Sequence, residues 1–205
     1  MGAAAQLHRL VELGLPDLAG ISADELAGHA ADLPDEPGTV LAVHPSLVPS
    51  AVLATLLRRD GKPGFVVADM ADLAEFGPID GLSVPDRPLY LVQDVERGDE
   101  MRNWSPDEAL PVVTGRGRTP LTISEGIAWL LQEPKQLERN ACFMTVGSRK
   151  RTAKGLDART PAIWISGGTG RDGRENRGAP KVGWCWAGNR HTWLGFASAA
   201  ARLPA

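Results

Sequence analysis

The residues best suited to chemistry lie close together near the end of the chain. The run from Gly183 to Gly195 contains three of the six tryptophans, one of the two cysteines and one of the four histidines. A thiol beside an imidazole can become a nucleophile, and clustered indole rings can line a pocket for an organic ligand. The run therefore offers two kinds of chemistry, a Cys185–His191 pair and an aromatic binding surface.

The secondary structure around this run decides which chemistry is possible. Residues 187–190 (Ala-Gly-Asn-Arg) are typical of a turn, so the flanking segments 181–186 and 191–197 are expected to pair as a hairpin. A four-residue loop places the tryptophans and the histidine of this run on one face and Cys185 on the other. A loop of three or five residues brings Cys185 to the face of His191.

The predicted binding surface combines indole rings with nearby polar side chains. Tryptophans grouped on one hairpin face are typical of a pocket lining, and equally of a core. Asn189 also suits the turn itself, and Arg149 is suited to holding an anionic substrate. The candidate ligand-binding residues are Trp164, Trp184, Trp186, Asn189, Trp193 and Arg149, and the candidate catalytic residues are Cys185 and His191.

The distribution of charge adds a third possibility. The net charge of −3 conceals an asymmetry, because residues 1–147 hold 11 basic and 22 acidic side chains, whereas residues 148–181 hold nine basic and three acidic ones. Such a basic segment can attract phosphate or carboxylate groups. It can also lie against the acidic face of its own molecule, which we favour for most of these charges. The pI near 5.8 argues against a nucleic-acid partner.

Length and composition define the class of protein. With 205 residues and 43% hydrophobic side chains, the chain is expected to form one domain with a buried core. No apolar run is long enough to cross a membrane, and two cysteines are too few for a disulfide framework, so a cytoplasmic protein is expected. Rossmann and Walker motifs are absent, and His8, His29 and His44 have no ligand partners at recognisable spacing. The sequence predicts neither a cofactor nor a metal site.

The pattern along the chain predicts an α+β fold in a single domain, residues 1–205. Residues 1–33 are expected to be helical, with two short helices, residues 34–140 to form a small α/β layer with a partly parallel sheet, and residues 141–200 to be β-rich with a Trp-rich hairpin. The clearest helix is predicted at 121–133, where Thr122 and Glu125 form a capping box.

The remaining expectations concern shorter segments. A further helix is predicted at 50–59. Strands are predicted at 39–43, 65–67, 88–95, 142–146, 162–166, 181–186 and 191–197. Two Gly/Arg-rich stretches, 147–160 and 167–180, are predicted to be long loops, and loops of this length in a small domain are often functional. Cys142 is expected to be a buried strand residue.

Several motifs carry a resemblance. The most specific is Pro180–Gly195, with its GWCWxGNxHTWLG-type signature. Shorter similar segments are Gly61–Val66, Tyr90–Asp99, Arg118–Gly126, Cys142–Arg149 and Ala162–Gly167. Together these motifs resemble an actinobacterial domain-of-unknown-function family over about residues 6–200. The resemblance implies no activity, cofactor or catalytic residue, because the family has no established activity.

Three functions therefore follow from the sequence. We favour a cytoplasmic protein that binds a small organic or peptide-like ligand, which can be anionic, at the aromatic face. The first alternative is an enzyme of hydrolase or transferase type that uses Cys185 and His191. The second alternative is a non-catalytic protein whose basic loops dock an acidic partner. A thiol pKa near the ordinary ~8.5 argues against the enzyme, and a steep loss of binding with salt favours the docking protein.

Overall fold

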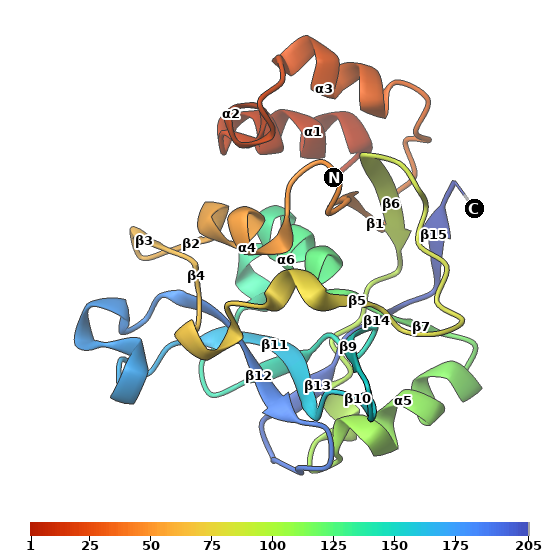
Figure 1. Cartoon of the computed structure of the whole chain (residues 1–205). Coiled ribbons are helices and arrows are strands. Elements are labelled where there is room, and N and C mark those ends of the chain that lie inside the picture. Colours follow the sequence, from red (N-terminus) through yellow and green to blue (C-terminus); the bar gives the residue numbers. More distant parts are fainter. Residues whose placement is uncertain (205) are drawn as a thin grey trace.

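The computed structural model describes residues 1–204 and has an α+β fold, as the sequence predicts (Figure 1). Three helices precede the first strand, one more than expected: α1 (Ala3–Glu12), α2 (Leu15–Ala19) and α3 (Ala23–Ala30). Gly14, at a φ of 88°, lies between the first two helices, and Pro16 lies in the first turn of α2. These two residues favour a break because glycine adopts the left-handed region easily and proline suits a helix start.

A three-stranded antiparallel sheet lies beneath these helices. It has the order β1 (Thr39–Val43), β6 (Leu89–Gln93) and β15 (Ala201–Leu203). The prediction of a partly parallel sheet in this part of the chain is wrong for β1 and β6. A parallel connection needs a crossover of a dozen or more residues, usually a helix. The helix predicted at 50–59 is only α4 (Ser50–Leu53) followed by the 3₁₀ turn η1 (Ala54–Leu56).

A five-stranded sheet forms the second half of the molecule. Its strands, in spatial order, are β13 (Leu194–Phe196), β8 (Cys142–Met144), β11 (Arg159–Ile165), β12 (Pro180–Trp186) and β4 (Phe65–Val66). The central pairs β8–β11 and β11–β12 are antiparallel, whereas the two edge strands pair in parallel. Predicted strands thus appear at each expected place in this half, within a few residues of their expected bounds.

Two helices cover opposite faces of the five-stranded sheet. α6 (Ile123–Gln132) begins at the predicted capping box and lies between the two sheets, where Gly126 approaches Phe143 and Ile163 (Figure 1). α5 (Pro106–Gly115) covers part of the other face and packs Ala109 and Val113 against Met144, Ala162 and Phe196. The sequence analysis missed α5, although Ser105 and Glu108 form a capping box at its start.

The Trp-rich hairpin is present, but its strands are β11 and β12. These two strands pair over seven residues, with Thr160 opposite Cys185 and Trp164 opposite Lys181. The expected pairing of 181–186 with 191–197 does not occur, because β13 begins only at Leu194 and pairs with β8. In the observed arrangement β12 pairs with β11 while β13 pairs with β8, so the backbone groups of both segments have partners.

Shorter elements complete the chain. The remaining strands are β2 (Arg58–Arg59), β3 (Lys62–Pro63), β5 (Phe76–Pro78), β7 (Thr119–Pro120), β9 (Ser148–Thr152), β10 (Gly155–Leu156) and β14 (Ser198–Ala199). The other 3₁₀ helices are η2 (Ala68–Met70), η3 (Leu73–Glu75), η4 (Asp99–Met101), η5 (Pro134–Gln136), η6 (Gly170–Asp172) and η7 (Arg174–Asn176).

The predicted loop at 147–160 is wrong, because β9 and β10 form a hairpin there. The stretch 167–180 contains only η6, η7 and the first residue of β12. None of the helices in residues 1–204 is long and apolar enough to cross a membrane.

A buried ion pair connects α6 to the three-stranded sheet. Arg202 donates from Nε and Nη2 to the two carboxylate oxygens of Glu125, at 2.6 and 2.8 Å, and Tyr90 donates to Oε1 of the same carboxylate at 2.9 Å. Burial raises the pKa of Tyr90 well above its ordinary value. The phenol therefore stays protonated and donates to Glu125, which fixes α6 between the two sheets.

Candidate functional site

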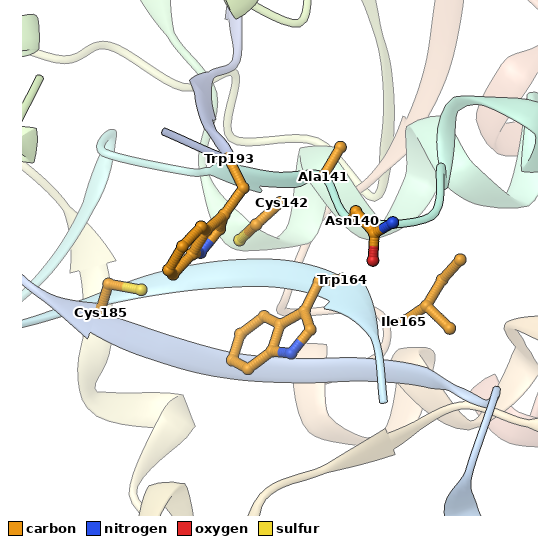
Figure 2. A pocket seen from close by; sticks show the side chains of 7 residues that line it. All are labelled: Asn140, Ala141, Cys142, Trp164, Ile165, Cys185 and Trp193. Carbon is orange, nitrogen blue, oxygen red and sulfur yellow. The ribbon is translucent and has the colours of Figure 1, made fainter. Parts of the chain in front are cut away.

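A cleft of about 350 Å³ opens on the α5 side of the five-stranded sheet (Figure 2). We call it the thiol–indole cleft; its lining residues are Asn140, Ala141, Cys142, Trp164, Ile165, Cys185 and Trp193. It lies at the edge of the apolar cluster that α5 covers, since Trp164 and Cys185 pack against that cluster while remaining partly exposed. Its volume is within the range of small-molecule sites.

Trp164 projects from β11 and is held in place by its neighbours on β12. A Cβ added to Gly183 would lie 2.6 Å from Cη2 of Trp164, so the indole occupies the space that a side chain at position 183 would fill. The ammonium group of Lys181 lies 4.6 Å from the centre of the indole ring. Asp172 accepts from the same ammonium group at 2.7 and 2.8 Å, which neutralises its charge. Trp164 is therefore oriented before any ligand arrives.

Trp193 lines the cleft from the loop 187–193. Its side chain is 49% exposed, and the imidazole of His191 stacks on it with ring centres 4.6 Å apart and an interplanar angle of 17°. The loop is attached to the first turn of α5 and to the segment before it, because Asp107 N donates to the carbonyl of Ala187 and Asn103 N donates to the carbonyl of His191, both at 3.0 Å. His191 thus supports the orientation of Trp193 and is not itself part of the lining.

Both cysteines line the cleft as free thiols (Figure 2). They lie on β8 and β12, which are separated by β11. Two strand spacings place their Cα atoms about 10 Å apart or more, beyond the ~7 Å limit for a disulfide. Burial raises the pKa of Cys185 to about 11, against a smaller opposing effect of Lys181, and burial also raises the pKa of Cys142. At neutral pH both groups are therefore protonated, weakly polar thiols.

The predicted Cys185–His191 pair has no hydrogen bond within residues 1–204. The geometry that would bring the two residues together required pairing between 181–186 and 191–197, and this pairing is absent. His191 stacks on Trp193, while Cys185 faces the cleft from β12. A nucleophilic thiolate needs a cation or base within reach, and the pKa of Cys185 is raised rather than lowered. A catalytic role of these residues stays a prediction without geometric support.

The predicted ligand-binding tryptophans are divided between the two faces of the sheet. Trp164 and Trp193 line the cleft, whereas Trp184 and Trp186 project from β12 to the opposite face and pack edge to face, with ring centres 4.5 Å apart. Trp184 also packs against the main core, the apolar cluster that includes Phe143, Ile163 and Val182, so it is partly a core residue. Asn189 is exposed in the loop 187–193 and does not line the cleft.

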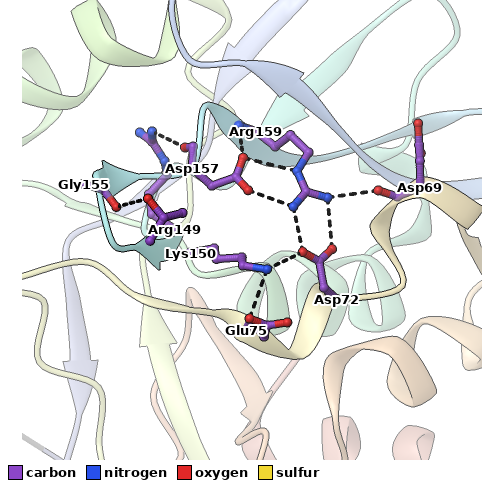
Figure 3. Close-up of polar contacts among 9 residues, drawn as sticks. Asp69, Asp72, Glu75, Arg149, Lys150, Gly155, Asp157 and Arg159 are labelled. Carbon is purple, nitrogen blue, oxygen red and sulfur yellow. Dashed lines mark hydrogen bonds and ion pairs between the residues drawn. The ribbon is translucent and has the colours of Figure 1, made fainter.

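Arg149 lies on β9 and is not among the residues that line the cleft. Its side chain is buried and donates to the carbonyl of Asp157 at 2.8 Å and to Asp107 Oδ1 at 3.4 Å (Figure 3 shows the first of these partners). The expectation that Arg149 holds an anionic ligand therefore has no support from its position. The arginine instead joins the β9–β10 hairpin to the start of α5.

The basic segment is largely neutralised by the chain itself. Arg159 binds Asp72 and Asp157, and Lys150 binds Asp72 and Glu75 (Figure 3). The basic residues of 148–181 that form ion pairs are Arg149, Lys150, Arg151, Arg159, Arg171 and Lys181. The hydrogen bonds and charges of Arg159 and Lys150 hold the pKa of Asp72 well below its ordinary value. The interpretation that most of these charges lie against the acidic body is confirmed, which leaves few of them for an acidic partner.

Four lining residues were not among the predicted site residues: Asn140, Ala141, Cys142 and Ile165. Asn140 has a positive φ of 56°, which asparagine tolerates better than most residues, and this turn directs the chain into β8 beside the cleft. Cys142 is buried in β8, as expected, and also lines the cleft. Within residues 1–204, no three His, Cys, Asp or Glu side chains gather as a metal site would require.

The comparisons with known proteins identify a family but no activity. The model described as Family of unknown function (DUF5701) matches residues 9–205. The match extends from α1 to the end of the chain and includes the three strands β8, β11 and β12 and the loop 187–193, which line the cleft. No curated protein and no solved structure matches the chain. The evidence for function is therefore the geometry of the cleft and its surroundings.

Proposed function

We propose that this chain, which belongs to the DUF5701 family of unknown function, binds a small organic ligand in the thiol–indole cleft. The planar apolar part of the ligand lies against Trp164 and Trp193. A cytoplasmic location is part of the same proposal, since both cysteines are free thiols and reduced cysteines are typical of that compartment. An actinobacterial origin, suggested by the C-terminal signature, is also part of it.

The observation that carries the proposal is the support of two indoles by residues outside the cleft. Gly183 and Lys181 orient Trp164, and His191 orients Trp193. Because the rings are already ordered, a ligand does not have to pay the entropy of fixing them. An exposed, ordered indole gains free energy when a flat apolar group covers it, both from burial and from ring stacking.

The cysteines favour binding over catalysis. With a pKa raised by burial, Cys185 is a weak nucleophile at neutral pH, and the same holds for Cys142. A protonated thiol is a soft, weakly polar group that packs well against an aromatic ring. In this proposal the two thiols therefore form apolar walls of the cleft.

The test uses 1-naphthol as a neutral aromatic probe, titrated by isothermal calorimetry. A ring of this size should bind with a Kd of about 0.1–1 mM, as expected for a small ligand with few polar contacts. Trp193→Ala should weaken binding about tenfold, since an aromatic contact contributes about 1 kcal/mol beyond burial. Urea denaturation of the variant confirms that it is folded.

Trp186→Ala is the matched control. Trp186 is 47% exposed, almost the same as Trp193, but it lies on the other face of the sheet. Its replacement should change the affinity for 1-naphthol less than twofold. Absence of naphthol binding to the unmodified protein, or an equal loss of affinity in both variants, would overturn the proposal.

A further inference from the structure

A second cavity, of about 430 Å³, adjoins the thiol–indole cleft. Asn140 and Ile165 line both hollows, so the two lie next to each other. The second, which we call the basic cavity, is otherwise lined by Arg59, Asp60, Lys62, Arg139, Arg177 and Gly178. A ligand seated against the indoles can therefore extend into a region of a very different chemical character.

The basic cavity is built from segments that are fastened to one another. The turn between β2 and β3 contains Asp60 and Gly61 at φ values of 50° and 77°, as a two-residue hairpin turn requires. The ammonium group of Lys62 donates to the carbonyls of Glu175 and Arg177, both at 2.8 Å. These contacts tie the hairpin to the segment after η6 and fix two sides of the cavity.

The charges of this cavity are not balanced. Arg59 pairs with Asp60, with 2.6 Å between Nη1 and Oδ2. The other three cations of the lining have no carboxylate within ion-pair distance in residues 1–204: Lys62, Arg139 and Arg177. Of the nine cations in residues 148–181, six form such pairs, and Arg177 is one of the three that do not. Three unpaired cations that line one hollow repel one another, and an anion between them removes that repulsion.

We propose that the ligand is an organic phosphate, with its ring in the thiol–indole cleft and its phosphate group in the basic cavity. The ring part of this inference rests on the proposed function, and the phosphate part rests on the three unpaired cations. Arginine side chains suit phosphate because the planar guanidinium can donate two parallel hydrogen bonds to its oxygens. The exposed side chains of Arg139 and Arg177 are free to close on the group, while Lys62 is already held by the backbone.

Two matched probes, 1-naphthol and 1-naphthyl phosphate, separate the two parts of the inference. At low salt the unmodified protein should bind 1-naphthyl phosphate about 10–100-fold more tightly than 1-naphthol, an advantage typical of two or three charge-assisted hydrogen bonds. In the double variant Arg139→Gln/Arg177→Gln this advantage should fall below about threefold, whereas the affinity for 1-naphthol should not change. Inorganic phosphate should compete with 1-naphthyl phosphate but not with 1-naphthol.

The control is a double variant with the same change in net charge, Lys154→Gln/Arg174→Gln. Both of its residues are exposed, belong to the basic segment and lie outside the lining of either hollow. This variant should retain the preference for 1-naphthyl phosphate. If the two probes bind equally to the unmodified protein, or if the control loses the preference as well, the phosphate site is overturned while the proposed function stands. If 1-naphthol does not bind, the proposed function itself fails.

Discussion

The two faces of the five-stranded sheet carry similar side chains but differ in how they are covered. On the face beneath α6, Phe143, Ile163 and Val182 are fully buried in the main core. We call this the closed face. On the other face α5 covers only part of the sheet, and Trp164 and Cys185 remain partly exposed beside the cleft. We call this the open face.

The difference shows how one sheet can serve both stability and binding. Where α6 covers the closed face, the side chains are excluded from water and contribute mainly to folding, whereas Trp186 at the end of β12 stays exposed. On the open face, ordered aromatic rings remain accessible, so burial there is still available to a ligand. Substitutions on the closed face should therefore reduce stability, and substitutions around the cleft should reduce affinity.

The largest expected effect is on the closed face, at Phe143. Phe143→Ala should lower the free energy of unfolding by about 3–5 kcal/mol, the usual loss for a phenylalanine removed from a packed core. Trp193→Ala on the open face should lower it by less than about 1 kcal/mol, because half of that side chain is already exposed. Urea denaturation of both variants measures the contrast. A loss of similar size at Trp193 would mean that this indole is a packing residue, and the comparison of the two faces would fail.

The reactivity of Cys185 tests whether the open face is a binding site or a catalytic one. Its pKa is raised to about 11 by burial, so at pH 7 alkylation by iodoacetamide should be about 100-fold slower than for an ordinary cysteine with a pKa of ~8.5. The rate should still be rising at pH 10. Peptide mapping by mass spectrometry measures the rate at Cys185, and the same residue in urea-unfolded protein is the control. A rate that is already constant below pH 8 would indicate a stable thiolate and favour the enzyme alternative.

Two glycines give a matched test of the two faces. A Cβ at Gly126, on α6, would lie 2.7 Å from Cγ2 of the buried Thr145, so Gly126→Ala should lower the unfolding free energy by about 1–3 kcal/mol through overpacking. A Cβ at Gly183 would meet only the indole of Trp164 at such close range, and this indole can move into the cleft. Gly183→Ala should therefore cost less than about 1 kcal/mol of stability but weaken 1-naphthol binding about tenfold. Urea denaturation and calorimetry measure the two effects, and the reverse pattern would contradict the assignment of the faces.

Local signals in the sequence predicted the elements of the closed face well. The helix α6 follows from the capping box of Thr122 and Glu125 and an apolar stripe, all within a dozen residues. The strand segments follow from short apolar runs. The helix α5 was missed because Pro111 interrupts its pattern, although its own capping box begins at Ser105.

Pairing between distant segments was not predictable from local signals. The partner of β12 is β11, across the stretch 166–179, and nothing in the sequence of 181–186 distinguishes this partner from the nearer segment 191–197. Trp164, Cys185 and Trp193 were among the candidate residues and line the cleft, whereas Trp184 and Trp186, which were grouped with the other tryptophans, project to the other face. The position of Arg149 was not predictable for the same reason, since its partner Asp107 belongs to a helix that the local pattern did not indicate.

The smallest expected effect concerns the ion pairs around Asp72, at the end of the closed face. Arg159 projects from β11 on the same side as Ile163 and donates to Asp72 Oδ2 at 2.7 Å, and Lys150 donates to the same oxygen at 2.7 Å. These contacts depress the pKa of Asp72, so their stabilising contribution is complete above the ordinary pKa near 4 and is lost as the pH falls through the lower value of the folded state. Asp72→Asn should cost about 1 kcal/mol at pH 7, because the site is partly open to water.

The pH dependence distinguishes this contribution from a general loss of packing. Below pH 4 the stability of the unmodified protein should fall more steeply than that of Asp72→Asn, so the difference between them should shrink as the pH approaches 2. Asp80→Asn is the control, because Asp80 pairs with Arg151 where both side chains are largely exposed, and such pairs contribute little. Urea denaturation between pH 7 and pH 2 measures all three proteins. A constant difference in unfolding free energy across this range would show that Asp72 acts through its shape rather than its charge. The ion pairs of Arg159 and Lys150 with Asp72 would then contribute nothing measurable, and the contrast between these paired cations and the unpaired cations of the basic cavity would fail.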